Sequence, residues 1–380
     1  MNVKKIFTMS LTTAIIVTAL NFSVASADTD LTKSKSEKLE SKHTIVLNKK
    51  DPENKKYEAN KLLFMTSQDD NGTLLFSDSP ETVEEDGILF QDAVKGNGRL
   101  LYYHLNGTQE DKKIAVVAEN LSNEDNQITM TKKAVSGPSD DYLYVGKTGL
   151  KRYFDNQQEE ILTIPAKGKT LFYAPDGERI VPSGGLVYGV FDFNAKENVK
   201  LTVIMAPKDE NLIKFADKAS VQQKDAQRLR GKYQGKDRCL TNRNPYNPQK
   251  SGSAYFYVGD NKTDLYKYGY DKTDNSITQN FGNYGIVYTI NPKLAGEGKT
   301  SFYLKPLGGV YSGAICVKVG KDGQSKMIET PDTLPFFGHE AKYNYYAYLG
   351  TYNNSDDVYF EYTPPGASNL PVEIILIPEK

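Results

Sequence analysis

The residues best suited to ligand chemistry in this 380-residue chain are arginines that lie close together. Four of the seven arginines form this group, and they are Arg228, Arg230, Arg238 and Arg243. A guanidinium group binds phosphate oxygens through paired hydrogen bonds, so the group is a candidate site for a polyanion such as a teichoic-acid-like wall polymer. Acidic neighbours at Asp225 and Asp237 and turn signals at Pro245 and Pro248 favour another interpretation, an ordered segment that enters a second domain.

The two cysteines, Cys239 and Cys316, lie in the same half of the chain. Because the N-terminal segment described below indicates export, we predict a disulfide between them. Such a bond would close a loop of about 77 residues, which in the chain-entropy model adds roughly 4 kcal/mol to the free energy of unfolding.

Tyrosine is the most frequent aromatic residue, with 26 tyrosines and no tryptophan. Two sets alternate along expected strands, so each set shares one face: Tyr255 with Tyr257, and Tyr266 with Tyr268 and Tyr270. An aromatic ring can stack on the apolar face of a sugar, which makes both sets candidate glycan-stacking surfaces. The competing interpretation is structural, because tyrosines half-bury well on sheets and pair across strands.

No catalytic motif is recognisable in the sequence. The three histidines, His43, His104 and His339, lack metal-ligand spacing, and His104 is expected to face solvent or a second layer. The chain contains no G-x-S-x-G, H-E-x-x-H or phosphate-binding loop motif. We therefore predict no catalytic residue, no metal site and no cofactor.

Acidic residues offer two weaker possibilities. Oxygen ligands of the kind that calcium prefers occur at Asp260, Asn261, Asp264, Asp271 and Asp274. Their spacing is not that of an EF-hand, and such residues are also ordinary turn formers. A glycosidase would need two nearby acids, and the 48 acidic residues single out no pair. A concave surface with converging carboxylates would favour a hydrolase, whereas a flat tyrosine surface would favour binding.

Strands are the elements expected to position these residues. Short runs rich in Val, Ile, Leu, Tyr and Thr, among them "KIAVVAEN", "DYLYVGK" and "SAYFYVGD", alternate with turn formers along the chain. One helix is expected at 208–230, because Leu212, Phe215 and Ala219 recur at helical spacing. The sequence therefore predicts an all-β fold of two antiparallel β-sandwich domains joined by one helix. We place the first domain at 43–207, with its first strand at 44–48, and the second, Tyr-rich domain at 231–380.

The N-terminus predicts export. Lys4 and Lys5 precede an apolar run that ends in Ala25-Ser26-Ala27, the pattern of a signal peptide over 1–27, and 28–42 is expected to be a disordered charged leader. We predict no membrane span after cleavage and no sorting signal in the C-terminal "LPVEIILIPEK". A formal net charge of −1 supplies no global field for nucleic acid, so we predict no nucleic-acid binding.

Several segments resemble uncharacterised secreted proteins of spore-forming Gram-positive bacteria. The resemblance covers about 60–380 and rests on "RGKYQGKDR", "NYGIVYTI", "LGGVYSGAICV" and "FEYTPPGASNLPVEIILIP", with "GRLLYYHLNGT" and "GLVYGVFDFNA" in the middle of the chain. Relatives in that group often have a copper amine oxidase N-terminal-like (stalk) domain, whose pattern is not evident here. The resemblance implies an extracellular or envelope context, and it implies no activity.

These observations predict a secreted, non-catalytic binding or surface protein that acts at or near the bacterial cell envelope. The expected partner is a cell-wall polymer, an extracellular glycan or a protein, and the expected location is extracellular or non-covalently associated with the envelope. Two alternatives remain open: a secreted hydrolase acting on glycan or peptide, and a structural matrix or spore-surface component.

Overall fold

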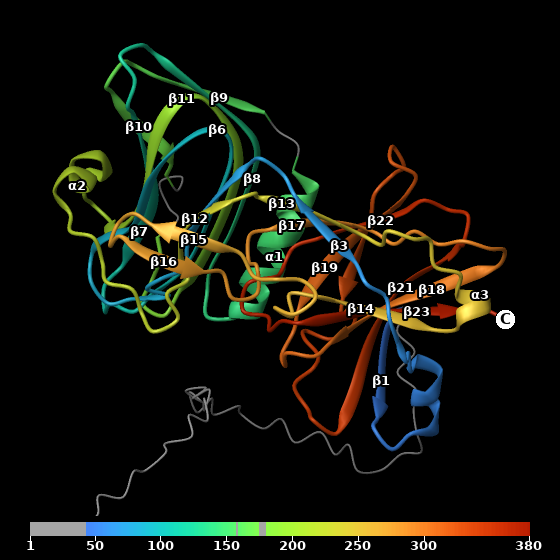
Figure 1. Cartoon of the computed structure of the whole chain (residues 1–380). Helices are drawn as coiled ribbons and strands as arrows, with labels where there is room; N and C mark the ends of the chain where they lie inside the picture. Colours follow the sequence, from blue (N-terminus) through green and yellow to red (C-terminus); the bar gives the residue numbers. More distant parts are fainter. Residues whose placement is uncertain (1–42, 157–158, 175–179) are drawn as a thin grey trace, which may run out of the picture. The chain divides into compact units, whose positions relative to one another are not determined.

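The structure is a computed structural model, and it describes residues 43–156, 159–174 and 180–380. Strands account for most of these residues (Figure 1), so the predicted all-β class is confirmed. The predicted signal peptide and leader lie outside the described residues. Within the described ranges the strands form three sheets, one of eleven strands and two of six. No helix in these ranges is both long and apolar enough to cross a bilayer.

The eleven-stranded sheet comes mainly from the first half of the chain. Its main path has the order β10-β7-β11-β6-β4-β12-β15-β16, and β5, β8 and β9 pair beside this path. The bounds are β4 (Thr73–Ser77), β5 (Thr82–Val83), β6 (Gly87–Asn106), β7 (Lys112–Asn120), β8 (Asn126–Ser139), β9 (Glu160–Ile164), β10 (Lys169–Tyr173), β11 (Leu186–Pro207), β12 (Arg230–Gln234), β15 (Tyr268–Asp271) and β16 (Ser276–Gln279).

The long strands β6 and β11 give this sheet its curvature. They pair antiparallel, but the register shifts between Ala195 and Val199, opposite the segment from Val94 to Gly96, and Gly96 has a φ of 79°. Extra residues on one strand of a pair bend it and increase its twist. The first part of β11 also pairs with β8 and the last part with β7. The sheet therefore curves around its own core, which contains Leu100 and Phe191 (Figure 1).

The two six-stranded sheets come mainly from the second half. One has the order β1-β21-β18-β23-β14-β2, with bounds β1 (Thr44–Asn48), β2 (Lys61–Leu62), β14 (Ala254–Val258), β18 (Lys299–Pro306), β21 (Tyr343–Asn353) and β23 (Val372–Pro378). The other has the order β20-β19-β22-β17-β13-β3, with bounds β3 (Thr66–Asp69), β13 (Asp237–Thr241), β17 (Val287–Asn291), β19 (Gly313–Val319), β20 (Lys326–Thr330) and β22 (Val358–Tyr362). The predicted first strand at 44–48 is confirmed as β1.

The helical elements differ from those predicted. They are η1 (Pro52–Tyr57), α1 (Tyr142–Asp155), α2 (Leu212–Lys218) and α3 (Pro248–Ser251). The strand predicted at "DYLYVGK" was wrong: this segment begins α1, where Asp141 caps the Tyr144 amide and buried Gly146, Leu150 and Tyr153 recur at helical spacing. The helix predicted over 208–230 is confirmed only in α2, because the helix ends at Lys218 and residues 219–229 are not helical.

The arrangement of two sandwiches joined by one helix is not confirmed. The early strands β1 and β3 pair with the late strands β21 and β13, and β4 pairs with β12 across the expected boundary. One core contains Phe76 and Leu101 from the first half together with Phe256 and Ile290 from the second. Helix α1 contacts β8 and β11 on one side and β19 on the other (Figure 1), so both halves share one packed interior.

Candidate functional site

A cavity of about 200 Å³ lies where the end of β4, the start of α1 and the loop 364–369 meet. Two carboxyl side chains and four tyrosines stand out in its lining. The lining residues are Phe76, Asp78, Glu81, Leu101, Tyr103, Tyr142, Tyr188, Leu229, Tyr284, Pro364, Gly366, Ala367, Ser368 and Asn369. Distant parts of the sequence therefore build one concave site, the kind of place where small ligands usually bind.

The loop that follows β4 is held rigidly at the cavity wall. The Asp225 carboxylate accepts hydrogen bonds from Ser79 Oγ and from the Glu81 amide, each 2.8 Å long. Arg230 Nη1 donates to the Ser79 carbonyl oxygen at 3.2 Å. Asp78 lies within this loop, and its own amide donates to the Leu229 carbonyl at 3.0 Å. These contacts fix the Asp78 backbone on both sides of the residue.

His104 supports the same loop; of the two positions expected for it, solvent or a second layer, the solvent-facing one was wrong. Its side chain is fully buried, and burial lowers its pKa to about 4, so the ring is neutral at pH 7. Its Nδ1 lies 2.8 Å from the Pro80 carbonyl oxygen, which only accepts, so Nδ1 has the proton. Nε2 then accepts from Ser77 Oγ at 2.8 Å. The histidine is a structural support for the loop.

Asp78 is the most unusual side chain in the cavity. The residue is only 9% exposed, and its Oδ1 atom is buried without a hydrogen-bond partner. Burial, with smaller contributions from the negative charges of Glu81 and Asp225, raises the pKa of Asp78 well above its ordinary value. A buried polar atom without a partner is costly, and in a cavity it indicates a functional site.

Glu81 lies on the same lining but in a different environment. Surrounding atoms, and then the negative charge of Asp225, raise the pKa of the Glu81 carboxyl, although the residue is exposed to solvent. Water screens the charge of this exposed side chain, so Glu81 ionises more readily than Asp78.

Four tyrosines form the aromatic part of the remaining wall. Burial raises the pKa of Tyr103, Tyr142, Tyr188 and Tyr284, so all four hydroxyl groups stay protonated at neutral pH. The Tyr103 and Tyr188 rings meet edge to face with centroids 6.5 Å apart. The Tyr284 hydroxyl donates to the Ser368 carbonyl oxygen at 2.6 Å, which connects the wall to the loop 364–369.

Glycines allow this wall to pack closely. A Cβ atom on Gly366 would lie 2.6 Å from the Tyr103 ring, and one on Gly149 of α1 would lie 2.3 Å from the Tyr188 ring. A Cβ on Gly146 would lie 2.1 Å from the Gly366 carbonyl oxygen. These distances are shorter than any normal contact. Glycine at these positions therefore lets α1 and the loop 364–369 approach closely enough to enclose the cavity.

The predicted arginine cluster does not form a common surface. Arg230 is 1% exposed, and its Nε donates to Asp271 at 2.7 Å. Arg238 is 6% exposed and pairs with Asp69 at 2.7 Å and with Asp264 at 2.5 Å. Both guanidinium groups are therefore occupied by acids of this chain, and neither is accessible to a polymer.

Arg228 and Arg243 are exposed, and they are the accessible members of the predicted group. The turn near Arg243 is ordered by Asn242, whose side chain accepts from the Lys293 amide at 2.7 Å and donates to the Lys293 carbonyl at 2.9 Å. These contacts agree with the interpretation of this stretch as an ordered segment. Because Arg230 and Arg238 are buried, only two arginines of the group are left for the predicted polyanion site.

The predicted disulfide is absent, and both cysteines are free thiols. Cys239 lies on β13 and Cys316 on β19, and strands β17 and β22 separate them in the sheet. Three strand spacings put the two Cα atoms about 14 Å apart, whereas a disulfide requires roughly 4.4–6.8 Å. The prediction was wrong because the chain path, not the loop length, decides whether two cysteines meet. Burial raises the pKa of Cys316 to about 11, so its thiol stays protonated.

The two predicted tyrosine sets differ in exposure. Tyr255 and Tyr257 are half-buried, with ring centroids 5.2 Å apart. Tyr266 precedes β15 and donates its hydroxyl proton to the Gly259 carbonyl oxygen at 3.2 Å. Tyr268 and Tyr270 on β15 are 69% and 44% exposed, so they share an open face. Glycan stacking stays a prediction for these two residues.

The acidic turn region considered for calcium has other partners. Asp260 accepts hydrogen bonds from the backbone amides of the turn that follows it, and Asn261 also accepts one. Asp264, Asp271 and Asp274 each pair with a lysine or arginine side chain. Within the described ranges, no group of three or more His, Cys, Asp or Glu side chains is arranged to hold a metal ion.

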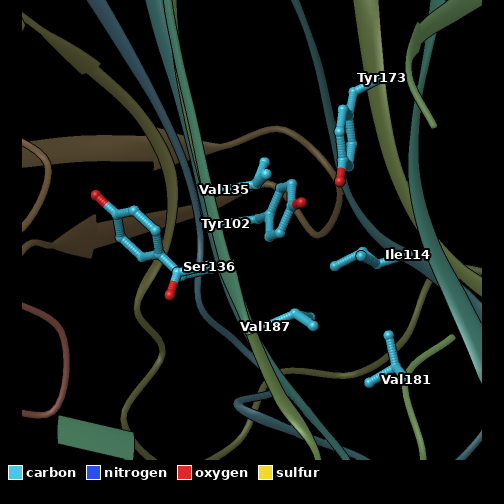
Figure 2. A pocket seen from close by; sticks show the side chains of 8 residues that line it. Tyr102, Ile114, Val135, Ser136, Tyr173, Val181 and Val187 are labelled. Atoms are coloured by element: carbon cyan, nitrogen blue, oxygen red, sulfur yellow. The ribbon is translucent and has the colours of Figure 1, made fainter. Parts of the chain in front are cut away.

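Two other hollows are less suited to a ligand. One, of about 10 Å³, lies inside the curved sheet, where Figure 2 shows Tyr102, Ile114 and Tyr173 around it. It has room for one water at most. The other, beside the C-terminal end of α1, is open to solvent and is lined in part by Lys133 and Glu160, which pair with each other at 3.5 Å.

No protein-family model matches this chain, and no curated protein matches it. Among solved structures, a Paenibacillus xanthan lyase is similar with a TM-score of 0.19 and 9% sequence identity. The match covers 78% of this chain and 25% of the lyase, so this chain spans about a quarter of that protein's length. A likeness at this TM-score supports no conclusion about fold or function.

Sequence reasoning missed the two acids of the cavity. Asp78 and Glu81 belong to the stretch "SDSPE", which places two acids around a proline directly after an apolar strand. That pattern was a usable signal, because a rigid turn at a strand end often presents polar side chains to a site. It was not distinctive among 48 acidic residues until the fold brought α1 and the loop 364–369 beside it.

Proposed function

We propose that this protein is a secreted, non-catalytic binding protein whose ligand site is the cavity beside Asp78. The proposal rests on one observation: a nine-tenths buried carboxyl lines a cavity and has an oxygen atom without a partner. A ligand that supplies the missing hydrogen bond would offset the cost of burying this group. The signal-peptide pattern at 1–27 supports action outside the cell, at or near the envelope.

The test compares binding to the protein with its cavity open and filled. Saturation-transfer NMR against a mixture of small neutral, anionic and cationic fragments should detect binding to the wild type. Leu229→Trp puts a large ring into the cavity lining and should abolish it. Leu212→Trp is the matched control, because Leu212 is also partly buried but lies in α2 and packs against a separate core cluster, outside the cavity. Equal binding by both variants would place the ligand elsewhere and refute the proposal.

A glycan hydrolase is the second candidate, because Asp78 and Glu81 are two carboxyl groups on one concave surface. Hydrolysis of this kind needs one protonated acid and one ionised carboxylate, so the two pKa values should be shifted apart. The pKa of Asp78 is raised more strongly than that of exposed Glu81, so Asp78 is the candidate acid and Glu81 the candidate carboxylate of such a pair. Turnover of nitrophenyl glycosides by the wild type, and its loss in Asp78→Asn, would favour the hydrolase over the binding protein.

A further inference from the structure

We propose that the cavity beside Asp78 binds the primary ammonium group of a small organic molecule. This inference rests on the function proposed above and specifies the chemical class of its ligand. It follows from how the chain treats its other buried acids, from the hydrogen-bonding needs of the unpartnered oxygen atom, and from the residue types that line the cavity.

Buried acids in this protein are normally neutralised by the protein's own cations. Among the described residues, six acidic side chains are buried, and every one except Asp78 has an ion pair with lysine or arginine. The five pairs are Asp92 with Lys232, Asp192 with Arg99, Asp264 with Arg238, Asp271 with Arg230, and Glu373 with Lys305. A buried carboxyl stays ionised only beside such a partner, so the cation that would ionise Asp78 has to come from outside the chain.

The cavity lining fits a cation better than an anion. Its described lining contains Asp78 and Glu81 and no lysine or arginine. Tyr103, Tyr142 and Tyr284 add aromatic rings to the lining, and aromatic rings attract cations through their quadrupole. An anionic ligand would meet two carboxyl groups, and a neutral ligand would leave Asp78 in its uncharged form, whereas a cation stabilises the ionised carboxylate.

Hydrogen bonding distinguishes between kinds of cation. Asp78 Oδ1 has no donor in the structure. A primary ammonium has three N–H donors and can supply this bond while the tyrosine hydroxyl oxygens accept the others. A quaternary ammonium has no donor, so it would satisfy the charge and leave the oxygen unbonded. The primary ammonium is therefore the better match. A volume of about 200 Å³ limits the ligand to a small molecule or to the end of a longer one.

The experiment uses a tryptophan reporter, which is feasible because the chain has none of its own. Tyr142→Trp keeps an aromatic ring in the lining, and its fluorescence reports occupancy of the cavity. The full-length variant is titrated with cyclohexylamine, its neutral analogue cyclohexanol, and the quaternary N,N,N-trimethylcyclohexylammonium at neutral pH. We expect cyclohexylamine to bind at least tenfold more tightly than either analogue.

A second variant separates charge recognition from shape. In the Tyr142→Trp background, Asp78→Asn should remove the preference for the amine while the cavity stays open. Cyclohexanol binding as tightly as cyclohexylamine would overturn the ammonium proposal and leave the ligand-binding function standing. Preference for the quaternary analogue would overturn the primary-ammonium assignment. Absence of any response, together with absence of fragment binding in the NMR test, would overturn both proposals.

Discussion

Replacing Asp78 by asparagine is expected to stabilise the folded protein at neutral pH, even though Asp78 is central to the proposed site. The carboxyl is buried, lacks a partner on Oδ1 and has a raised pKa because of burial. Asparagine has nearly the same shape and no charge. The substitution therefore removes a cost that the wild type tolerates, as expected where function and stability conflict.

The magnitude follows from the cost of the unpartnered group. Leaving a buried acceptor without a hydrogen bond costs about 1–3 kcal/mol. Asparagine keeps a polar amide in the same place and recovers only part of that cost. We therefore expect Asp78→Asn to raise the free energy of unfolding by about 1–2 kcal/mol at pH 7, with each unit of pKa elevation worth about 1.4 kcal/mol.

The pH dependence supplies the sharper test. The pKa of Asp78 is higher in the folded than in the unfolded chain, so the folded state binds more protons between the two values. The contribution of Asp78 to stability is present below the unfolded pKa and is lost as pH rises through the folded pKa. The variant does not titrate there, so its advantage should be smallest near about pH 4 and largest at neutral pH.

The assay is urea denaturation followed by far-UV circular dichroism from acidic to neutral pH. Asp225→Asn is the matched control, because the Asp225 carboxylate accepts bonds from Ser79 and from the amides of Glu81 and Gln227. The same chemical change should destabilise the protein there. A less stable Asp78→Asn variant at neutral pH, or a difference that does not change with pH, would refute the reasoning.

Three further outcomes are expected. Arg230→Met should lower the free energy of unfolding by about 3–5 kcal/mol, because it removes the guanidinium that pairs with buried Asp271; exposed Arg243→Met should change it by less than about 0.5 kcal/mol in the same chemical denaturation. Gly366→Ala places a Cβ 2.6 Å from the Tyr103 ring, so it should push the ring into the cavity and weaken cyclohexylamine binding roughly tenfold. Unfolded without reductant, the chain should titrate two thiols with a disulfide reagent, and a count of zero would restore the predicted disulfide.

The sequence predicted the strands well where local residues decide the conformation. In β14 the alternation of Ala254, Phe256 and Val258 with half-buried tyrosines is visible in the sequence and is confirmed by the burial pattern. Helix α1 was missed because its first residues, Tyr142 to Val145, favour strands by composition. Its helical conformation is stabilised by packing against β8, β11 and β19, which no local pattern reveals.

The site was less predictable, because its properties depend on residues far apart in the chain. The four arginines were recognised as a group. However, two of them form ion pairs with acids that are distant in sequence, Arg230 with Asp271 and Arg238 with Asp69. Asp78 was overlooked because its significance lies in a missing partner. Only the packed fold shows that a carboxyl is enclosed by the loop 364–369 and has no cation of its own beside it.

The pairing of early strands with late ones has a consequence for biosynthesis. β1 at Thr44–Asn48 pairs with β21 at Tyr343–Asn353, and β21 reaches the rest of its sheet through β18 and β23. During synthesis β1 is therefore made long before its pairing partner β21. Contacts of such long sequence separation form slowly and leave apolar strands open to aggregation. We expect the nascent chain to need a holding chaperone until its last strands have been made.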